Sequence, residues 1–331
     1  MSIIEVNGLV KEFRRPKPVV GPFGRMRTML TREYVTKRAV NGIEFRLEEG
    51  SLVGYLGPNG SGKSTTIKIL TGILQPTLGE VRVAGLVPWK EREQNALNIG
   101  VVFGQRSQLW WDLPLSDSLE LISRLYGMKR SRFLSNLARF TEILDLGPFS
   151  DVPVRQLSLG QRMRGDLAAA MLPEPRILYL DEPTIGLDVI AKTNIRQFIG
   201  TLNQQDGTTV VLTTHDLDDV EELCDRLMLI DDGRVLYDGN AEELKKRFLP
   251  YRRLIVRLAE SEEWQGLGIP AVEQEFGASG HADTVSLRFD PEGIDITELI
   301  NAVLASHTIR DISIMEPTLE NVVHRVYSSI E

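Results

Sequence analysis

The residues from Gly57 to Ser64 combine glycines, a lysine and a hydroxyl at a spacing suited to phosphate. They fit the pattern G-x-x-x-x-G-K-[ST], which follows an apolar run and precedes a helical pattern. The glycines let the backbone curl so that N–H groups point at phosphate oxygens, and the helix N-terminus adds partial positive charge. Lys63 can reach the β- and γ-phosphates, while the Ser64 hydroxyl can ligate Mg²⁺. The ATP-binding residues expected in this loop are Gly57, Pro58, Asn59, Gly60, Ser61, Gly62, Lys63, Ser64 and Thr65.

Two adjacent carboxylates, Asp181 and Glu182, follow the apolar run 177–180. A buried parallel strand delivers a carboxylate at its C-terminal end to the edge of the sheet where ligands bind. Asp181 is expected to hold Mg²⁺ there, together with Ser64, and Glu182 to polarise the water that attacks the γ-phosphate. Such a pair alone usually marks a solvated turn. With the phosphate loop upstream, it indicates ATP hydrolysis.

Short apolar runs alternate with helical patterns along the first three quarters of the chain, which predicts a parallel sheet covered on both faces in an α/β domain. A helix is expected to begin behind Ser158 as N-cap and to end before Pro173. The strands are expected at 52–56, 99–103, 177–180 and 209–212, with a hairpin at 226–237.

The composition excludes several classes of protein. A net charge of -8 argues against a nucleic-acid partner. The single cysteine, Cys224, rules out an intrachain disulfide and is typical of a reducing, cytosolic setting. No signal-peptide pattern opens the sequence, and no apolar run approaches the ~18 residues of a transmembrane helix. Work on a membrane would therefore require a partner.

The composition changes near Leu249-Pro250. Beyond this point, alternating apolar residues predict strands around 254–258 and 285–289, and helical spacing follows Asp295 and Pro317. The expected domains are 1–249 and 250–331, the second a small α+β domain.

Further motifs carry a family resemblance. Leu157-Ser158-Leu159-Gly160-Gln161 is similar to the signature L-S-G-G-Q, and Gly186-Leu187-Asp188 follows Glu182. Gln105 comes after one apolar strand and His215 after another. In this order and spacing, residues 3–248 resemble the nucleotide-binding subunits of ABC transporters. The resemblance implies a P-loop ATPase domain with a helical signature subdomain at about 105–172.

The resemblance also implies roles and partners. Such subunits work as a head-to-tail pair, formed with a second copy or a homologous subunit, on the cytoplasmic side of the cell membrane and bound to an integral membrane permease. His215 is expected to contact the γ-phosphate as a catalytic switch, and Gln105 to bind ATP and Mg²⁺. The residues expected to reach the partner's ATP are Ser158, Leu159, Gly160, Gln161 and Asp188.

Four features depart from the family pattern. Leu159 replaces the first signature glycine, and Gly104 is an extra residue before Gln105. The aromatic residue that stacks on adenine is matched best by Phe13, with Tyr34 as a rival. Between these two aromatic residues lies most of an insertion, 14–38, that the family does not share.

The insertion 14–38 carries eight Lys or Arg residues and one acid, a net charge of +7. Its first half, rich in proline and glycine, is expected to be a loop, and Arg25–Tyr34 a short basic helix. Its interleaved apolar residues are compatible with a surface that meets anionic headgroups or acidic permease loops. A solvated basic loop is the alternative.

The tail of the chain, 311–322, resembles that of type-2 ABC exporter ATPases. The adjacent Trp110 and Trp111 lie where the family docks its membrane partner, although packing under the helical subdomain would also explain them. The function expected is that of an exporter's ATP-hydrolysing subunit. The alternatives are an importer ATPase subunit and a soluble mechanical ATPase of the same family.

Overall fold

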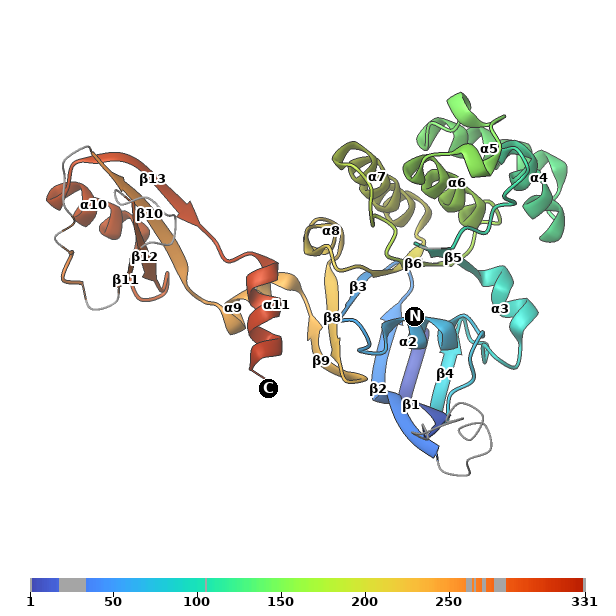
Figure 1. Cartoon of the computed structure of the whole chain (residues 1–331), viewed down its shortest axis with the longest axis horizontal. Helices are drawn as coiled ribbons and strands as arrows, with labels where there is room; N and C mark the ends of the chain where they lie inside the picture. Colours follow the sequence, from blue (N-terminus) through green and yellow to red (C-terminus); the bar gives the residue numbers. More distant parts are fainter. Residues whose placement is uncertain are drawn as a thin grey trace, which may run out of the picture. The chain divides into compact units, whose positions relative to one another are not determined.

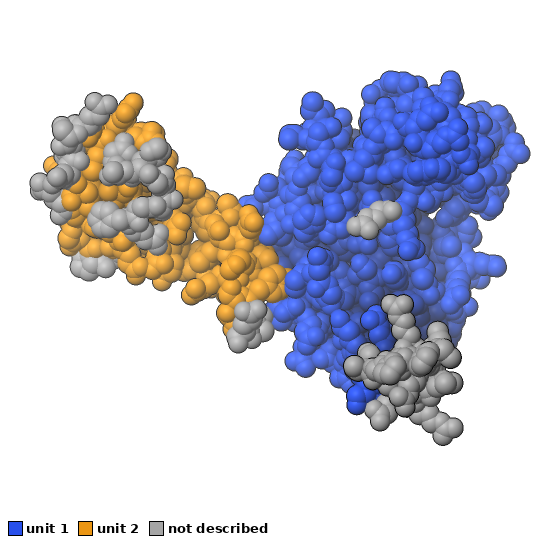
Figure 2. All heavy atoms as spheres, in the orientation of Figure 1, with its two compact units in different colours: residues 1–239 blue, residues 240–331 orange. Residues whose placement is uncertain are grey.

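The computed structural model describes residues 2–17, 34–104, 106–259, 264, 266–269, 272–276 and 284–329. The chain divides into two compact units, Met1–Gly239 and Asn240–Glu331, which are coloured separately in Figure 2. The first unit contains two sheets and the second unit one, and each unit has its own buried apolar core.

The first unit is built on a six-stranded sheet in which five strands run parallel and the last, at one edge, is antiparallel (Figure 1). The four strands predicted from apolar runs are all present in it, and the predicted hairpin supplies the other two. In sheet order the strands are β5 (Ile99–Phe103), β6 (Ile177–Asp181), β7 (Thr209–Thr213), β3 (Leu52–Leu56), β8 (Arg226–Asp231) and β9 (Arg234–Gly239).

Helices connect these strands. The helix after β3 begins directly at the phosphate loop, and another follows β6 and its two carboxylates. The connecting helices are α2 (Lys63–Leu70), α3 (Arg92–Asn98), α7 (Val189–Asp206) and α8 (Leu217–Leu223). Between β5 and β6 the chain forms a cluster of helices, visible as a group in Figure 1: α4 (Leu115–Leu125), α5 (Arg130–Ile143) and α6 (Leu159–Met171).

Helix α6 begins where the sequence predicted. The Gln161 backbone N–H donates to Ser158 Oγ at 3.2 Å, and the Ser158 N–H donates to Gln161 Oε1 at 2.9 Å. This reciprocal capping box satisfies two N–H groups that would otherwise lack partners at the helix start.

A second, antiparallel sheet of three strands completes the first unit. Its order is β2 (Tyr34–Glu48), β1 (Ser2–Pro16) and β4 (Leu78–Val83). It shares one apolar core with the parallel sheet, in which the rings of Phe45 and Tyr55 lie 6.2 Å apart.

The two ends of the basic insertion 14–38 belong to this sheet. Strands β1 and β2 pair as far as Pro16 and Tyr34, so Arg14–Pro16 is strand rather than loop. The expected helix Arg25–Tyr34 is wrong at its last residue, because Tyr34 begins β2 and pairs with Pro16. Residues 25–33 lie outside the described part of the chain. Cross-strand pairing decided the conformation here, and local composition did not reveal it.

The second unit contains a four-stranded antiparallel sheet, one face of which is covered by α10 (Ile296–Ser306). Its strand order is β11 (Val272–Phe276), β12 (Thr284–Phe289), β10 (Arg252–Leu258) and β13 (Ile309–Met315). Helices α9 (Ala241–Phe248) and α11 (Leu319–Ser328) contact each other and belong to the same unit. The composition change at Leu249-Pro250 therefore lies one short helix beyond the point where the units divide.

In the described part of the chain, no helix combines the length and apolarity that crossing a membrane requires.

We expect the core of the second unit to depend on α10. Leu299 on this helix is 0 % exposed, whereas Leu304 on the same helix is 57 % exposed. Leu299→Ala should lower the free energy of unfolding of this unit by about 2–5 kcal/mol, because it leaves a cavity in the core. Leu304→Ala is the matched control, with an expected change within about 0.5 kcal/mol. Urea unfolding of both variants measures the difference, and equal losses would contradict the assigned packing.

Candidate active site

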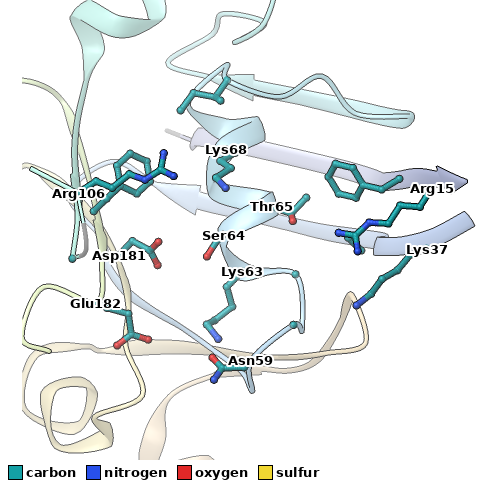
Figure 3. Close-up of a pocket in the computed structure, with 17 residues that line it drawn as sticks. Arg15, Lys37, Asn59, Lys63, Ser64, Thr65, Lys68, Arg106, Asp181 and Glu182 are labelled. Carbon is teal, nitrogen blue, oxygen red and sulfur yellow. The ribbon is translucent and has the colours of Figure 1, made fainter. Parts of the chain in front are cut away.

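One cavity of about 620 Å³ in the first unit brings together Phe13, part of the phosphate loop, and the carboxylates Asp181 and Glu182 (Figure 3). It receives side chains from the β1–β2 pair, the phosphate loop, α2, and the ends of β5 and β6. Its lining comprises Phe13, Arg15, Lys37, Ala39, Asn59, Gly60, Gly62, Lys63, Ser64, Thr65, Lys68, Ile73, Phe103, Gly104, Arg106, Asp181 and Glu182.

The phosphate loop requires its glycines for steric reasons. Gly62 has φ 108°, and a Cβ there would collide with the carbonyl oxygen of Ala39. A Cβ on Gly57 would collide with the carbonyl oxygen of Ile230. The backbone can therefore pass close to its neighbours and turn its N–H groups toward the cavity only if these positions lack side chains.

Lys63 begins α2, and its side chain bends back over the loop. Its Nζ donates to the carbonyl oxygens of Gly57 at 2.5 Å and Pro58 at 3.1 Å. Burial lowers the pKa of the ammonium, and the carboxylates of Glu182 and Asp181 oppose that shift. A cation held in this poorly solvated position gains strongly from an anionic ligand.

Asp181 is the last residue of β6 and is held in place on two sides. Thr213 Oγ1, at the end of β7, donates to Asp181 Oδ1 at 2.5 Å, and the Gly104 N–H donates to the Asp181 carbonyl at 2.7 Å. Its carboxylate points toward Ser64 (Figure 3). Two hard oxygen donors therefore converge in the cavity, as a magnesium site would require.

Glu182 and His215 meet, although they lie on different strand ends. His215 Nδ1 is 2.6 Å from Glu182 Oε2. Glu182 has φ 57°, a left-handed conformation that is uncommon outside glycine. This turn allows the side chain to leave the strand and line the cavity. A carboxylate whose orientation is set by an imidazole is a suitable arrangement for a general base.

A buried ion network ties together the segments that follow these two residues. Asp219, 0 % exposed, accepts from Arg196 Nε at 2.6 Å and from Thr184 Oγ1 at 2.5 Å. Nearby, Lys192 Nζ donates to Asp216 Oδ2 at 2.5 Å. The links join α7 to α8, so the positions of the turn after Glu182 and the turn after His215 are coupled.

Gly104, which is an extra residue in the family pattern, has a steric explanation. A Cβ at this position would collide with the carbonyl oxygen of Glu182. The backbone of residue 104 thus lies directly against the end of β6. Gln105, expected to bind ATP and Mg²⁺, lies outside the described residues.

The segment after residue 105 is fixed to helix α6 by Asp166. The carboxylate accepts from Ser107 Oγ at 2.9 Å and from the Gln108 N–H at 3.0 Å, and Gln108 Nε2 donates to the Asp166 carbonyl at 3.0 Å. Burial raises the pKa of Asp166 to about 6, against the opposing effect of these hydrogen bonds and of Arg162. The signature helix and the end of β5 are therefore mechanically connected.

The signature residues do not appear among the described residues that line the cavity. Ser158 and Gln161 form the cap of α6, and Asp188 caps α7 by accepting from the Ala191 N–H at 2.8 Å. Leu159 is half-buried, and its Cδ2 would lie 3.1 Å from a Cβ at Gly186. The side chain of Leu159, which replaces a signature glycine, therefore packs against the loop of the same chain that contains Gly186.

The two aromatic candidates for stacking on adenine differ in their position. Phe13 lines the cavity, whereas Tyr34 is 58 % exposed and is not among the described lining residues. Trp110 and Trp111 are 38 % and 52 % exposed, so neither is packed beneath the helices, although Arg162 lies 5.3 Å from the Trp111 ring.

Sequence reasoning missed four basic residues in the cavity. Lys68 lies one helical turn after Ser64, a spacing that could have indicated it. Arg15 lies two residues after Phe13 on the same strand, which is also a readable signal. Lys37 and Arg106 come from separate segments and carry no such local signal.

We expect Gly104→Ala to damage the site, because the added methyl forces the backbone away from Glu182. The free energy of unfolding should fall by about 1–3 kcal/mol, and ATP turnover should fall with it. Gly200→Ala is the matched control, since a Cβ on this α7 residue meets nothing within 4 Å. Alanine should stabilise that helix by about 0.5–1 kcal/mol. Denaturation and turnover assays check that Gly104→Ala lowers stability and ATP turnover and that Gly200→Ala raises stability.

Asp166→Asn should change the pH dependence of stability. The raised pKa means that the folded state binds this proton more tightly, so the group's contribution to stability falls as pH rises from its ordinary pKa of 3.8 to about 6 and then levels off. Asparagine keeps the acceptor and lacks the ionisation. The stability of the variant relative to the parent should rise by up to about 3 kcal/mol between pH 4 and pH 7. A difference that is constant across urea titrations at these pH values would contradict the prediction.

Comparison with known proteins identifies the family of the chain. The family model described as "ABC transporter" matches residues 40–185. The chain is 38 % identical over 218 residues to the daunorubicin resistance ATP-binding protein DrrA3 of Streptomyces coeruleorubidus, covering 65 % of this chain and 67 % of the relative. It is 32 % identical to the daunorubicin/doxorubicin resistance ATP-binding protein DrrA of Streptomyces peucetius, covering 88 % and 89 %.

Among solved structures, the ATP-binding cassette MJ0796, a dimer bound to ADP and Pi, is similar at a TM-score of 0.60 and 26 % identity. The similarity covers 72 % of this chain and 98 % of that one. The chain belongs to the ABC transporter ATP-binding proteins and is an ATP-binding, ATP-hydrolysing subunit of that family.

Proposed function

We propose that this chain powers an exporter through a Mg²⁺-dependent ATPase cycle in which two ATPase subunits close on ATP. The observation that carries the proposal is the contact of 2.6 Å between His215 Nδ1 and Glu182 Oε2, because Glu182 lines the same cavity as Lys63 and Ser64. It joins a base, a polar switch and a phosphate-binding cation in one site.

Each residue of the cavity has a role in the proposal. The phosphate loop and Lys63 hold the β- and γ-phosphates, and Phe13 stacks on the base. Glu182 accepts the proton of the attacking water, while His215 orients Glu182 and contacts the γ-phosphate. Gln105 is proposed to complete the metal and phosphate contacts.

Magnesium fits the residues present. Ser64 Oγ and the Asp181 carboxylate supply oxygen donors, and among the described residues no group of three acidic or histidine side chains forms a metal cage. Few protein ligands are typical of Mg²⁺, which completes its shell with substrate phosphates and water. When bound, the ion would neutralise charge on the transferred phosphoryl group.

Ser158, Leu159, Gly160, Gln161 and Asp188 are proposed to act on the ATP of a second subunit. Support comes from the capped start of α6, whose N-terminus carries partial positive charge suited to a phosphate. These residues line no part of the described cavity of their own chain, and the similar cassette MJ0796 was solved as a dimer.

The proposed partner is an integral membrane permease, bound at the cytoplasmic face of the membrane. The exposed Trp110 and Trp111 offer aromatic anchors for it. Relatives are named for daunorubicin resistance and for Nod factor export, which favours export over import.

Glu182→Gln tests the proposal. The amide is nearly isosteric but cannot accept the proton, so ATP turnover should fall by about 10²–10⁴-fold while ATP binding is retained. The variant should then accumulate as an ATP-bound dimer, which light scattering would detect. Lys63→Ala is the contrasting control, because it should lose tight nucleotide binding and therefore the dimer. Turnover of Glu182→Gln at the parental rate would show that Glu182 is not the base.

A further inference from the structure

The β1–β2 pair directs one face at the nucleotide cavity. Side chains alternate along a strand, so Phe13 and Arg15 project to the same side of β1. Lys37 lies directly opposite Phe13 in the register of the two strands and shares that side. All three residues line the cavity of about 620 Å³. Two of them, Arg15 and Lys37, come from the ends of the basic insertion 14–38.

One cation on the outer face of this strand pair is balanced by an ion pair, whereas among the described residues the two that line the cavity are not. On the outer face, Arg38 lies opposite Glu12 and donates to Glu12 Oε1 from Nη2 at 2.8 Å and from Nε at 3.0 Å. On the cavity face, Arg15 and Lys37 have no carboxylate within ion-pair distance among the residues that the structure describes. With respect to the described residues, the positive charge of Arg15 and Lys37 is therefore directed at the cavity without an ion-pair partner.

These cations lie away from the reacting end of the cavity. In Figure 3, Arg15 and Lys37 extend from the strand pair on the side of Thr65, and Asp181 and Glu182 occupy the other side. A nucleotide whose γ-phosphate lies between Lys63 and Glu182 would place its base and sugar toward the strand pair, where Phe13 lies.

We propose that Arg15 and Lys37 form a second cationic subsite of the nucleotide pocket, which binds the ribose–α-phosphate end of an adenine nucleotide. The inference rests on the proposed function, because it uses the orientation in which the base stacks on Phe13. It assigns the ends of the basic insertion to nucleotide binding rather than to a membrane or permease surface.

This position predicts a particular pattern of affinity. ATP and ADP share the sugar and α-phosphate, so both gain equally from the subsite. Binding energy that is the same in the ground state and the transition state acts on KM and leaves kcat largely unaffected. Because both side chains are exposed at the rim, salt screens their attraction, and the contribution decreases as ionic strength rises.

The test uses the full chain and calorimetric titration with MgATP and MgADP at low and high salt. The double variant Arg15→Gln/Lys37→Gln should weaken both nucleotides by about tenfold at low salt, with a smaller loss at high salt. The matched control is Arg14→Gln/Arg38→Gln, which removes the same charge from the same two strands on the outer face and should leave both affinities unchanged. The charge-preserving variant Arg15→Lys/Lys37→Arg should retain most of the parental affinity.

Three results would overturn the subsite. Equal losses in the cavity-face and outer-face variants would reduce it to a general charge effect. A loss for ATP without a loss for ADP would place the contact at the γ-phosphate. Unchanged affinity, together with weaker sedimentation on phosphatidylserine vesicles, would assign the basic strand ends to a membrane surface.

Failure of the proposed function has a different signature. Lys63→Ala should abolish tight binding of both nucleotides whether or not the subsite exists. If Lys63→Ala binds ATP like the parent, the orientation in the cavity is wrong and the proposed function fails. If Lys63→Ala loses ATP while Arg15→Gln/Lys37→Gln binds normally, only the subsite fails.

Discussion

The active site depends on the position of β7 between β3 and β6 in a parallel sheet. Parallel pairing brings the C-terminal ends of all three strands to one edge, so the phosphate loop, Asp181 and His215 emerge side by side although they are distant in sequence. The hydrogen bond from Thr213 to Asp181 fixes two of these ends directly. Without this strand order, the phosphate loop and Asp181 could not share a cavity, and His215 could not contact Glu182 at its edge.

Around this edge, glycines let neighbouring backbone segments pack directly against one another. Glycines at 57, 62 and 104 lie where a Cβ would collide with a neighbouring carbonyl oxygen. Each glycine lets a different pair of segments pack closely. The phosphate loop lies against β8, the start of α2 against β2, and the end of β5 against the end of β6. The cavity is therefore defined by backbone as much as by side chains, which suits a ligand bound largely through N–H groups.

Two polar links extend from this edge of the sheet into the helices. Asp166 ties the signature helix to the segment after β5, and Asp219 with Arg196 ties the turn after Glu182 to the turn after His215. Both carboxylates are buried and hydrogen-bonded, so they favour one arrangement of the segments they join. A change at the end of the cavity that Asp181 and Glu182 line is thus connected to both α6 and α7.

The sequence by itself determined the phosphate loop, the carboxylates that follow β6, the strands of the parallel sheet and the cap of α6. Local sequence patterns indicate these features: a fixed glycine–lysine spacing, apolar runs of strand length and an N-cap serine followed three residues later by glutamine. The tertiary structure alone decided that Gly104 must lack a side chain, that Asp166 is buried, and that Arg15 and Lys37 join Phe13 at the cavity. Each of these depends on a neighbour far along the chain. Cross-strand register and close backbone packing bring such neighbours together, and neither leaves a periodic signal in the residues themselves.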